Sequence, residues 1–196
     1  MSVAPPGLIL ASTSPYRREL LARLGLPFSV HRPDVDEQRQ PGEPPRARAE
    51  RLALAKASAV AALHPQSVVI GADQVAACGA LILDKPGNAD MARAQLRAQS
   101  GRSVQFFSAV AIVQAGSGSS DCFTDLTTVS LRPLGEAEID AYVAADRPFD
   151  CAGSLRSEGL GISLCERIES TDPTGLIGLP LIRLAAALRA RGYALP

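Results

Sequence analysis

Short continuous apolar runs alternate with helical patterns along the chain. Residues 8–11 (LILA) and 67–71 (SVVIG) have the length and composition of buried strands. Residues 46–63 carry leucine, alanine and valine at helical spacing, which predicts a long helix. Strands that alternate with helices in this way predict an α/β fold.

The same patterns place the remaining elements. Further strands are predicted at 27–30, 103–114, 121–131 and 161–168, and further helices at 16–24, 90–99, 136–145 and 179–191. A Gly/Ser-rich turn at 116–120 joins two of these strands, which predicts an antiparallel hairpin inside the fold. There is no internal repeat and no long linker, so we expect a single domain over 1–196.

The turn between the first strand and the first helix is a predicted anion site. Ser14 suits the N-cap, Pro15 the first helical position and Gly25 the C-terminal cap. Free N–H groups and the positive end of the helix dipole would face a phosphate chain there. We expect two hydroxyls and two guanidiniums to join them, from Ser12, Ser14, Arg17 and Arg18. An ordinary capped helix with solvated arginines is the alternative.

Composition narrows the classes of partner. The chain has 20 Lys and Arg against 20 Asp and Glu, and only 4% aromatic residues, which argues against a nucleic-acid polymer. No apolar run approaches the roughly 20 residues of a membrane helix, so we expect no membrane partner. The start of the chain does not resemble a signal peptide. The four cysteines form no C-x-x-C pair, and we expect them to be reduced core residues of a cytoplasmic protein.

Lysine is scarce in this chain. Of the 20 basic residues, only Lys56 and Lys85 are lysines. Lys56 falls within the apolar register of a predicted helix, where its ammonium must reach water or meet an anion. Lys85 lies in a predicted turn, at 84–87. Because lysine is a compact point charge and arginine a planar fork, both lysines are candidate phosphate contacts, with chance retention as the alternative.

Two carboxylates complete the candidate chemistry. Asp73 follows an apolar run and is expected at the carboxyl end of that strand, and Glu37 lies in a polar loop. Carboxylates, cations and a phosphate chain together are typical of Mg²⁺-assisted phosphoryl chemistry. A solvated surface charge is the alternative for each residue taken singly. The sequence has no Walker A motif and no nucleophile elbow, and its two histidines, expected at the surface, argue against a Ser-His-Asp mechanism or a zinc site.

The motifs, taken in order, resemble those of the Maf family of nucleoside triphosphate pyrophosphatases. They are S-T-S-P-Y-R-R-E-L-L from 12, D-E from 36, G-A-D-Q-V from 71, K-P from 85, A-G-S-L-R-S-E-G from 152 and D-P-T-G-L-I-G-L-P from 172. The resemblance extends over about 8–191, nearly the whole chain. It implies a mixed central sheet flanked by helices, with a cleft between two lobes. It also implies cleavage of the α–β linkage of a nucleoside triphosphate to a monophosphate and diphosphate.

The resemblance assigns roles to individual residues. It makes Asp73 the general base for water, and Glu37 and Asp73 the contacts of a divalent metal cation, Mg²⁺ or Mn²⁺. Phosphate binding falls on Ser12, Ser14, Arg17, Arg18, Lys56 and Lys85. A homodimer is also implied.

Three positions indicate a branch of that family. Tyr16, Gln74 and Glu158 resemble the branch that acts on 7-methyl-GTP, whereas the dTTP/UTP branch has Arg and Thr at the first two positions. The first position is often Trp in the 7-methyl-GTP branch, so Tyr16 is a departure. A cationic 7-methylguanine ring stacks well on an aromatic face, and a carboxylate accepts from the guanine N1–H and N2–H₂ together. The alternatives are hydrolysis of dTTP, UTP or another non-canonical triphosphate, or a nucleotide-binding regulator of septum formation.

Overall fold

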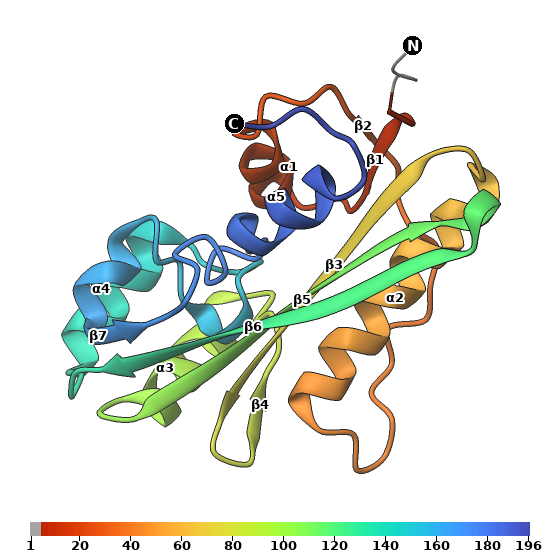
Figure 1. Cartoon of the computed structure of the whole chain (residues 1–196). Helices are drawn as coiled ribbons and strands as arrows, with labels where there is room; N and C mark the ends of the chain where they lie inside the picture. Colours follow the sequence, from red (N-terminus) through yellow and green to blue (C-terminus); the bar gives the residue numbers. More distant parts are fainter. Residues whose placement is uncertain (1–4) are drawn as a thin grey trace.

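The computed structural model describes residues 5–196, in which a mixed sheet of seven strands is flanked by helices (Figure 1). The strands are β1 (Leu8–Ala11), β2 (Ser29–Val30), β3 (Val68–Cys78), β4 (Leu81–Leu83), β5 (Ser103–Gln114), β6 (Ser119–Leu131) and β7 (Cys165–Glu169). The helices are α1 (Pro15–Ala22), α2 (Pro45–Leu63), α3 (Ala89–Gln99), α4 (Glu136–Asp146) and α5 (Leu181–Arg189). The predicted α/β class is confirmed.

The sheet has the order β2-β1-β3-β5-β6-β7, with β4 paired to β3. β1 is parallel to β2 and to β3, and the other pairs are antiparallel, including the predicted hairpin β5–β6. β3, β5 and β6 are 11, 12 and 13 residues long and run through the whole molecule. Both lobes pack on these three strands.

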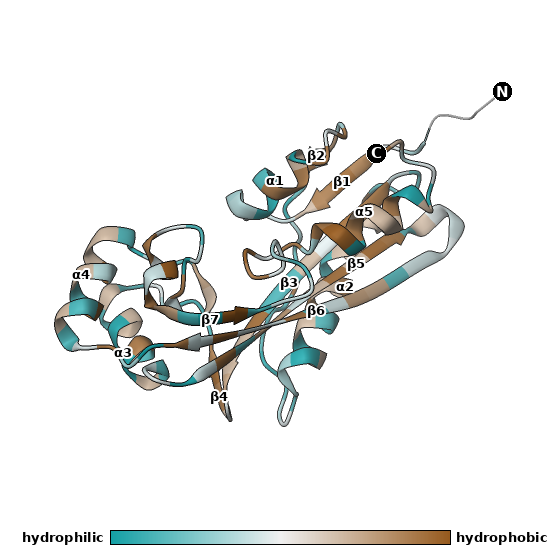
Figure 2. Ribbon diagram, turned by 60° about the vertical axis from the view of Figure 1, so that its left-hand side comes forward, coloured by the Kyte–Doolittle hydropathy of each residue, from teal (hydrophilic) through white to brown (hydrophobic). Residues whose placement is uncertain are grey.

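One lobe lies at each end of these long strands, as Figures 1 and 2 show. In the first, α1 and α5 pack on β1 and β3 around buried residues such as Leu10, Leu21 and Leu184. In the second, α3 and α4 pack on the other end of the sheet around Phe106, Leu96 and Ile139. In Figure 2, β1 and α5 are coloured as hydrophobic, and residues of both elements belong to the core of the first lobe. The two lobes expected from the family resemblance are therefore present.

α2 covers the face of the sheet opposite to the one on which the other helices pack, and its backbone lies very close to β3. A Cβ built on Gly71 would lie 2.3 Å from the Ala53 carbonyl oxygen and 2.6 Å from the Ala57 backbone nitrogen. Only glycine opposite a helix face of alanines permits this approach. The contact explains the alanine content of α2, and it places Lys56 of that helix beside β3.

Asp73 lies in the middle of β3, which corrects the expectation that it ends the strand. The polar pair Asp73-Gln74 interrupts the apolar run, but Val75 to Cys78 are buried and continue the ladder. β1 pairs with β3 only as far as Ala11 opposite Gly71. Asp73 therefore lies just beyond the carboxyl end of β1, where a parallel neighbour no longer covers it.

The predicted strand 161–168 is only partly correct. Residues Leu160–Leu164 form a 3₁₀ segment and β7 begins at Cys165. A Cβ on Gly161 would lie 2.5 Å from the Arg156 carbonyl oxygen, so this residue packs tightly on the preceding loop and takes no part in the sheet. The final helix is also shorter than predicted, because Pro180 is its N-cap and it ends at Arg189.

The cysteines and histidines differ from expectation. Cys78 is buried, but Cys122 is exposed and Cys151 and Cys165 are partly buried, so only one of the four is a core residue. All four are free thiols. The two histidines are half-buried and in contact, with 3.1 Å between the Nδ1 atom of His31 and the Nε2 atom of His64. Among the described residues no helix is long and apolar enough to cross a membrane.

Candidate active site

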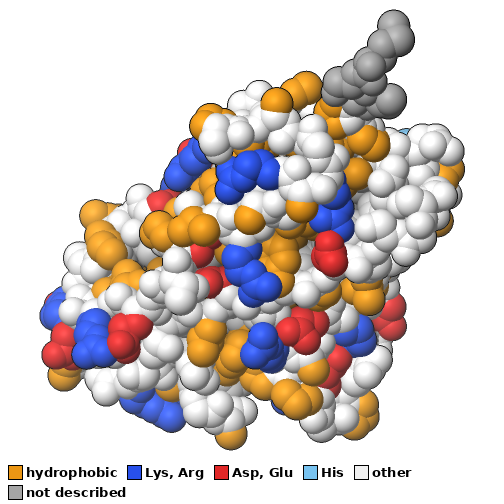
Figure 3. All heavy atoms as spheres, in the orientation of Figure 1, with side chains coloured by type: hydrophobic (Ala, Val, Ile, Leu, Met, Phe, Trp, Pro, Cys, Tyr) orange, Lys and Arg blue, Asp and Glu red, His pale blue; other side chains and the backbone are white. Residues whose placement is uncertain are grey.

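A cavity of about 750 Å³ opens where the two lobes meet, within the size range of small-molecule sites. Its walls come from the start of α1, the loop after β2, α2, β3, the loop after β4, and the segments around 150–158 and 176–177. Ten of the eleven predicted site residues line it: Ser12, Ser14, Tyr16, Arg17, Glu37, Lys56, Asp73, Gln74, Lys85 and Glu158. On the face drawn in Figure 3, basic and acidic side chains are interspersed with hydrophobic ones.

The first turn of α1 has the predicted capping geometry. Ser14 is the N-cap, and its hydroxyl accepts from the Arg17 backbone N–H at 3.4 Å. The Ser12 hydroxyl accepts from the Ser14 N–H at 3.1 Å, and Pro15 occupies the first helical position. The helix ends at Ala22, slightly before the predicted end. The turn thus presents its hydroxyls and the positive helix end toward the cavity.

Arg17 is held in the wall of the cavity. Its Nε donates to the Gly178 carbonyl oxygen at 3.0 Å, which ties α1 to the segment before α5. Burial lowers the pKa of the Arg17 guanidinium, and the charges of Asp73 and Glu37 oppose that shift. The side chain is therefore a pre-positioned cation, and within residues 5–196 part of its donor set has no hydrogen-bond partner.

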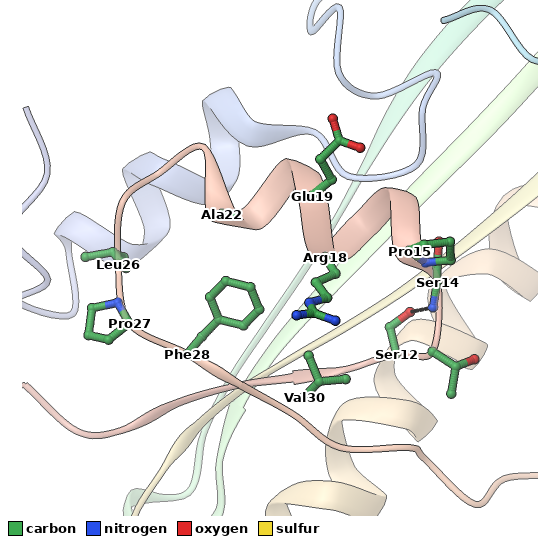
Figure 4. Close-up of a pocket in the computed structure, with 11 residues that line it drawn as sticks. Ser12, Ser14, Pro15, Arg18, Glu19, Ala22, Leu26, Pro27, Phe28 and Val30 are labelled. Carbon is green, nitrogen blue, oxygen red and sulfur yellow. Dashed lines mark hydrogen bonds between the residues drawn. The ribbon is translucent and has the colours of Figure 1, made fainter. Parts of the chain in front are cut away.

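Arg18 does not join this group, and the two guanidiniums do not converge. Consecutive helical residues point in different directions. Arg18 lines a second, open hollow of about 970 Å³, where Figure 4 shows its guanidinium pointing toward Phe28 and Val30. Ser12 and Ser14 border both hollows.

Lys56, Asp73 and Glu37 form a cluster of charges in the wall of the cavity, here called the Lys56 group. The Lys56 Nζ donates to Asp73 Oδ1 at 2.7 Å and lies 3.0 Å from Glu37 Oε1. Lys56 is 6% exposed and Asp73 8% exposed. A charge buried to this extent requires an opposite charge close by. Of the two outcomes expected for this lysine, water or an anion, the structure shows the second, with two carboxylates on one ammonium.

The donor set of the Lys56 group fits a hard divalent cation. Mg²⁺ is usually held by one or two carboxylates together with waters and substrate phosphates. Asp73 has its Oδ2 free of protein hydrogen bonds within residues 5–196, and the Glu37 side chain is 57% exposed and able to move. No group of three or more His, Cys, Asp or Glu suited to a metal occurs within residues 5–196, so phosphate oxygens would have to complete the shell.

Lys85 reaches the cavity from the loop after β4. It is exposed, and its neighbour Asp84 pairs with Arg48 at 2.9 Å. Arg48 also lines the cavity and was not identified from the sequence. It is one of three arginines at the start of α2, and nothing in that run distinguishes it from the solvated Arg46.

Tyr16, Glu158, Arg156 and Asp150 form a second set of contacts, here called the Tyr16 group. The Arg156 guanidinium lies over the Tyr16 ring at 5.9 Å, and its Nε is 3.6 Å from Glu158 Oε1. The Tyr16 hydroxyl donates to Asp150 Oδ1 at 3.4 Å. Burial, followed by the charges of Cys151 and Asp150, raises the pKa of Tyr16, which keeps the ring neutral. Sequence reasoning missed Arg156, although it lies inside one of the quoted motifs.

Known proteins resemble this chain along almost its full length. The model of the Maf family, described as Maf-like protein, matches residues 7–191. The 7-methyl-GTP pyrophosphatase of Polaromonas sp. is 55% identical over 188 residues, which are 96% of this chain and 86% of that protein. Proteins of the same name from Albidiferax ferrireducens and Xanthomonas campestris pv. campestris are 53% and 52% identical, and cover 94% and 97% of this chain and 93% and 99% of their own lengths.

The fold has a solved counterpart. The Staphylococcus aureus Ham1 protein superimposes with a TM-score of 0.53 at 13% identity, over 94% of this chain and 98% of its own. At that identity the likeness concerns the fold alone. The family match and the relatives settle the descent of the sequence: this chain belongs to the Maf family.

Proposed function

We propose that this chain is a hydrolase of phosphoric anhydrides that cleaves 7-methyl-GTP to 7-methyl-GMP and diphosphate. The observation that carries the proposal is the Lys56 group, a buried lysine held between two carboxylates at the wall of a cavity beside a helix N-terminus. The names of relatives at 52–55% identity support the substrate. Such an enzyme would remove modified nucleotides from the pool.

The triphosphate would lie against the cations of the cavity. Arg17, Lys56 and Lys85 offer three positive charges, and the Ser12–Ser14 turn adds hydroxyls and backbone N–H groups. These groups would neutralise the phosphate oxygens and hold the α–β linkage in place. Because they are positioned before the substrate arrives, little reorganisation is needed during the reaction.

Asp73 would accept the proton of the attacking water. The Lys56 ammonium donates to Asp73 Oδ1 at 2.7 Å and fixes the orientation of the carboxylate, and a general base must be held in place in this way. Glu37 and Asp73 would hold a divalent cation, Mg²⁺ or Mn²⁺, which when bound neutralises charge on the phosphates. Both carboxylates already lie on one ammonium, so they face the same point.

The base would be selected by Tyr16, Gln74 and Glu158. The Tyr16 ring offers a π face to the cationic 7-methylguanine, and Glu158 offers a carboxylate to its N–H edge. All three residues line the same cavity as the Lys56 group. A single substrate can therefore contact both sets at once.

We propose the cytoplasm as the location, which the four free cysteines support. The homodimer and the single domain over 1–196 remain predictions. A nucleotide is the proposed partner, with no role for a nucleic-acid polymer or a membrane.

Diphosphate release from a panel of triphosphates tests the proposal. The panel contains 7-methyl-GTP, GTP, UTP, dTTP and ITP, each with Mg²⁺, with Mn²⁺ and with a chelator, scored separately for diphosphate and for free phosphate. Fastest diphosphate release from 7-methyl-GTP is expected. Preference for UTP or dTTP would keep the enzyme and overturn the base selection, and no release from any substrate would favour a nucleotide-binding regulator.

A further inference from the structure

Three polar residues form a row across the centre of the sheet. Gln74 on β3 is directly opposite Ser108 on β5, which is directly opposite Asp125 on β6. Directly opposed residues share one face of a sheet, so the three side chains project to the same side. Ser108 is 1% exposed and Asp125 3% exposed. Of these three residues, only Gln74 was a predicted site residue.

The row binds the segment that precedes α5. The Gln74 Nε2 lies 2.9 Å from the Leu176 carbonyl oxygen and 3.2 Å from that of Gly175. The Ser108 hydroxyl donates to the Gly175 carbonyl at 2.7 Å. Asp125 accepts from the Thr171 hydroxyl at 2.6 Å. The segment is thus fixed at several points along the row, and its Leu176 lines the cavity.

These contacts determine which way the Gln74 amide points. Backbone carbonyl oxygens only accept, so the atom that lies between two of them must be the NH₂ nitrogen. The Ser108 hydroxyl donates its hydrogen to the Gly175 carbonyl, so towards Gln74 it can only accept. It accepts from the Gln74 Nε2 at 2.9 Å. A flipped amide would bring its oxygen against two carbonyl oxygens. Only one orientation is compatible with the network.

With its NH₂ held in this way, the Gln74 amide directs its oxygen toward the cavity. The Oε1 of Gln74 accepts no hydrogen bond within residues 5–196, and it is not among the buried polar atoms that lack a partner there. Gln99 makes the contrast: its NH₂ also donates to backbone carbonyls, but its Oε1 is buried and unpartnered. Gln74 lines the cavity and Gln99 does not. The Gln74 oxygen is therefore an acceptor on the cavity wall.

We infer that Ser108 is a positioning residue for base selection: together with the Gly175 and Leu176 carbonyls it holds the Gln74 NH₂, so that the Gln74 oxygen faces the cavity and this wall accepts an N–H of the base. The inference rests on the proposed function, because it takes Gln74 as a wall of the base site. Guanine and its 7-methyl form carry N–H donors on their N1 and N2 positions. Uracil carries a single N–H, on N3, between two carbonyl oxygens, so it offers this wall fewer donors than guanine does, and a small displacement brings a carbonyl oxygen against the Gln74 oxygen.

The test compares kcat/KM for two triphosphates whose bases belong to different classes, and uses the two that the wild-type chain hydrolyses fastest. We expect these to be 7-methyl-GTP and UTP, and the measured quantity is the ratio of kcat/KM for the first to that for the second. This ratio is independent of the fraction of active enzyme, so a merely destabilised variant does not change it. We expect Ser108→Ala to lower the ratio about threefold to tenfold, the usual effect of one neutral hydrogen bond. In a Gln74→Leu background, Ser108→Ala should change the ratio by less than about twofold, because the two residues act as one unit.

Thr124→Val is the matched control. Thr124 is also buried, on the strand next to Ser108, and its hydroxyl donates a bond of equal length, 2.7 Å, to Glu50 on the opposite face of the sheet. We expect this variant to keep the wild-type ratio. An unchanged ratio in Ser108→Ala, an equal fall in Thr124→Val, or an additive effect in the Gln74→Leu background would overturn the inference while leaving the pyrophosphatase intact. A wild-type chain that hydrolyses no triphosphate would overturn both.

Discussion

The Lys56 group and the Tyr16 group line one cavity but are built differently. In the Lys56 group two of the three charges, Lys56 and Asp73, are almost fully buried, and contacts of 2.7 and 3.0 Å join the three residues. In the Tyr16 group the contacts are longer, with 3.4 Å from Tyr16 to Asp150 and 3.6 Å from Arg156 to Glu158. Buried charges are tolerated only when their partners are pre-arranged, whereas half-exposed contacts cost little to adjust. We therefore expect changes in the first group to abolish turnover and changes in the second to alter selectivity.

The largest effect is expected from Asp73→Asn. The change keeps the shape of the side chain but removes the proposed base, and should reduce diphosphate release about 10³-fold. Asp121→Asn is the control, because Asp121 is an exposed carboxylate paired with Arg191 far from the cavity. Circular dichroism should show both variants folded. Retention of more than about a tenth of wild-type turnover by Asp73→Asn would contradict its role as base.

Lys56→Met should reduce both turnover and stability. It leaves Asp73 without its ammonium in a buried position, and the free energy of unfolding at pH 7 should fall by about 3–5 kcal/mol in a urea titration. The double variant Lys56→Met/Asp73→Asn removes both charges of the closest pair and should recover much of that loss. Equal stability of the single and the double variant would show that the loss does not come from an unpaired Asp73 carboxylate.

Arg17 and Arg18 are adjacent in sequence but face different hollows. Arg17→Ala should raise KM for the triphosphate about tenfold or more, because a cation of the cavity is lost. Arg18→Ala should change KM by less than about twofold. Steady-state kinetics of the two variants decide the matter, and comparable increases in KM would return Arg18 to the phosphate site as the sequence predicted.

Tyr16→Ala should reduce selectivity more than turnover. Loss of a cation–π contact of about 0.5–2 kcal/mol predicts a fall of about twofold to thirtyfold in the preference for 7-methyl-GTP over GTP. Tyr16→Phe keeps the ring and loses only the contact to Asp150, so it should retain the preference. If the alanine variant keeps the wild-type preference, Tyr16 does not read the charge of the base.

The smallest effect concerns the support of the Lys56 group. Arg51 donates to Glu43 at 2.8 Å and to the Gln38 carbonyl at 3.1 Å, next to Glu37 in the chain. The hydrogen bond from Arg51 is the largest cause that lowers the pKa of Glu43, to about 2 from an ordinary 4.5.

A carboxylate whose pKa is lowered on folding stabilises the protein above its unfolded pKa and loses that effect as pH falls through its folded pKa. Glu43→Gln should therefore be less stable than wild type above pH 4.5, with the difference vanishing near pH 2. Thermal unfolding across this range measures it. A difference that is constant with pH would exclude an origin in the charge of Glu43.

Much of the fold followed from local patterns. The N-cap at Ser14 and the hairpin β5–β6 were predicted correctly, and Lys56 meets an anion, one of the two outcomes expected of it. Each depends on residues close together in sequence. The extent of β3 and the start of β7 were not, because Asp73 interrupts a strand that its neighbours continue, and Gly161 packs against a loop that pattern reading does not place.

The sequence by itself determined the α/β class, the capped turn at Ser14, the ten residues that meet in the cavity and, through its motifs, the family. Those features rest on hydrophobic periodicity, capping chemistry and ordered motifs, and each of these depends on residues that are close together in the sequence. Tertiary structure alone decided that Arg18 turns away from Arg17, that Arg156 lies over Tyr16, and that the Gln74 NH₂ meets Ser108. These outcomes depend on strand register and on contacts between segments far apart in the chain, which no local pattern encodes.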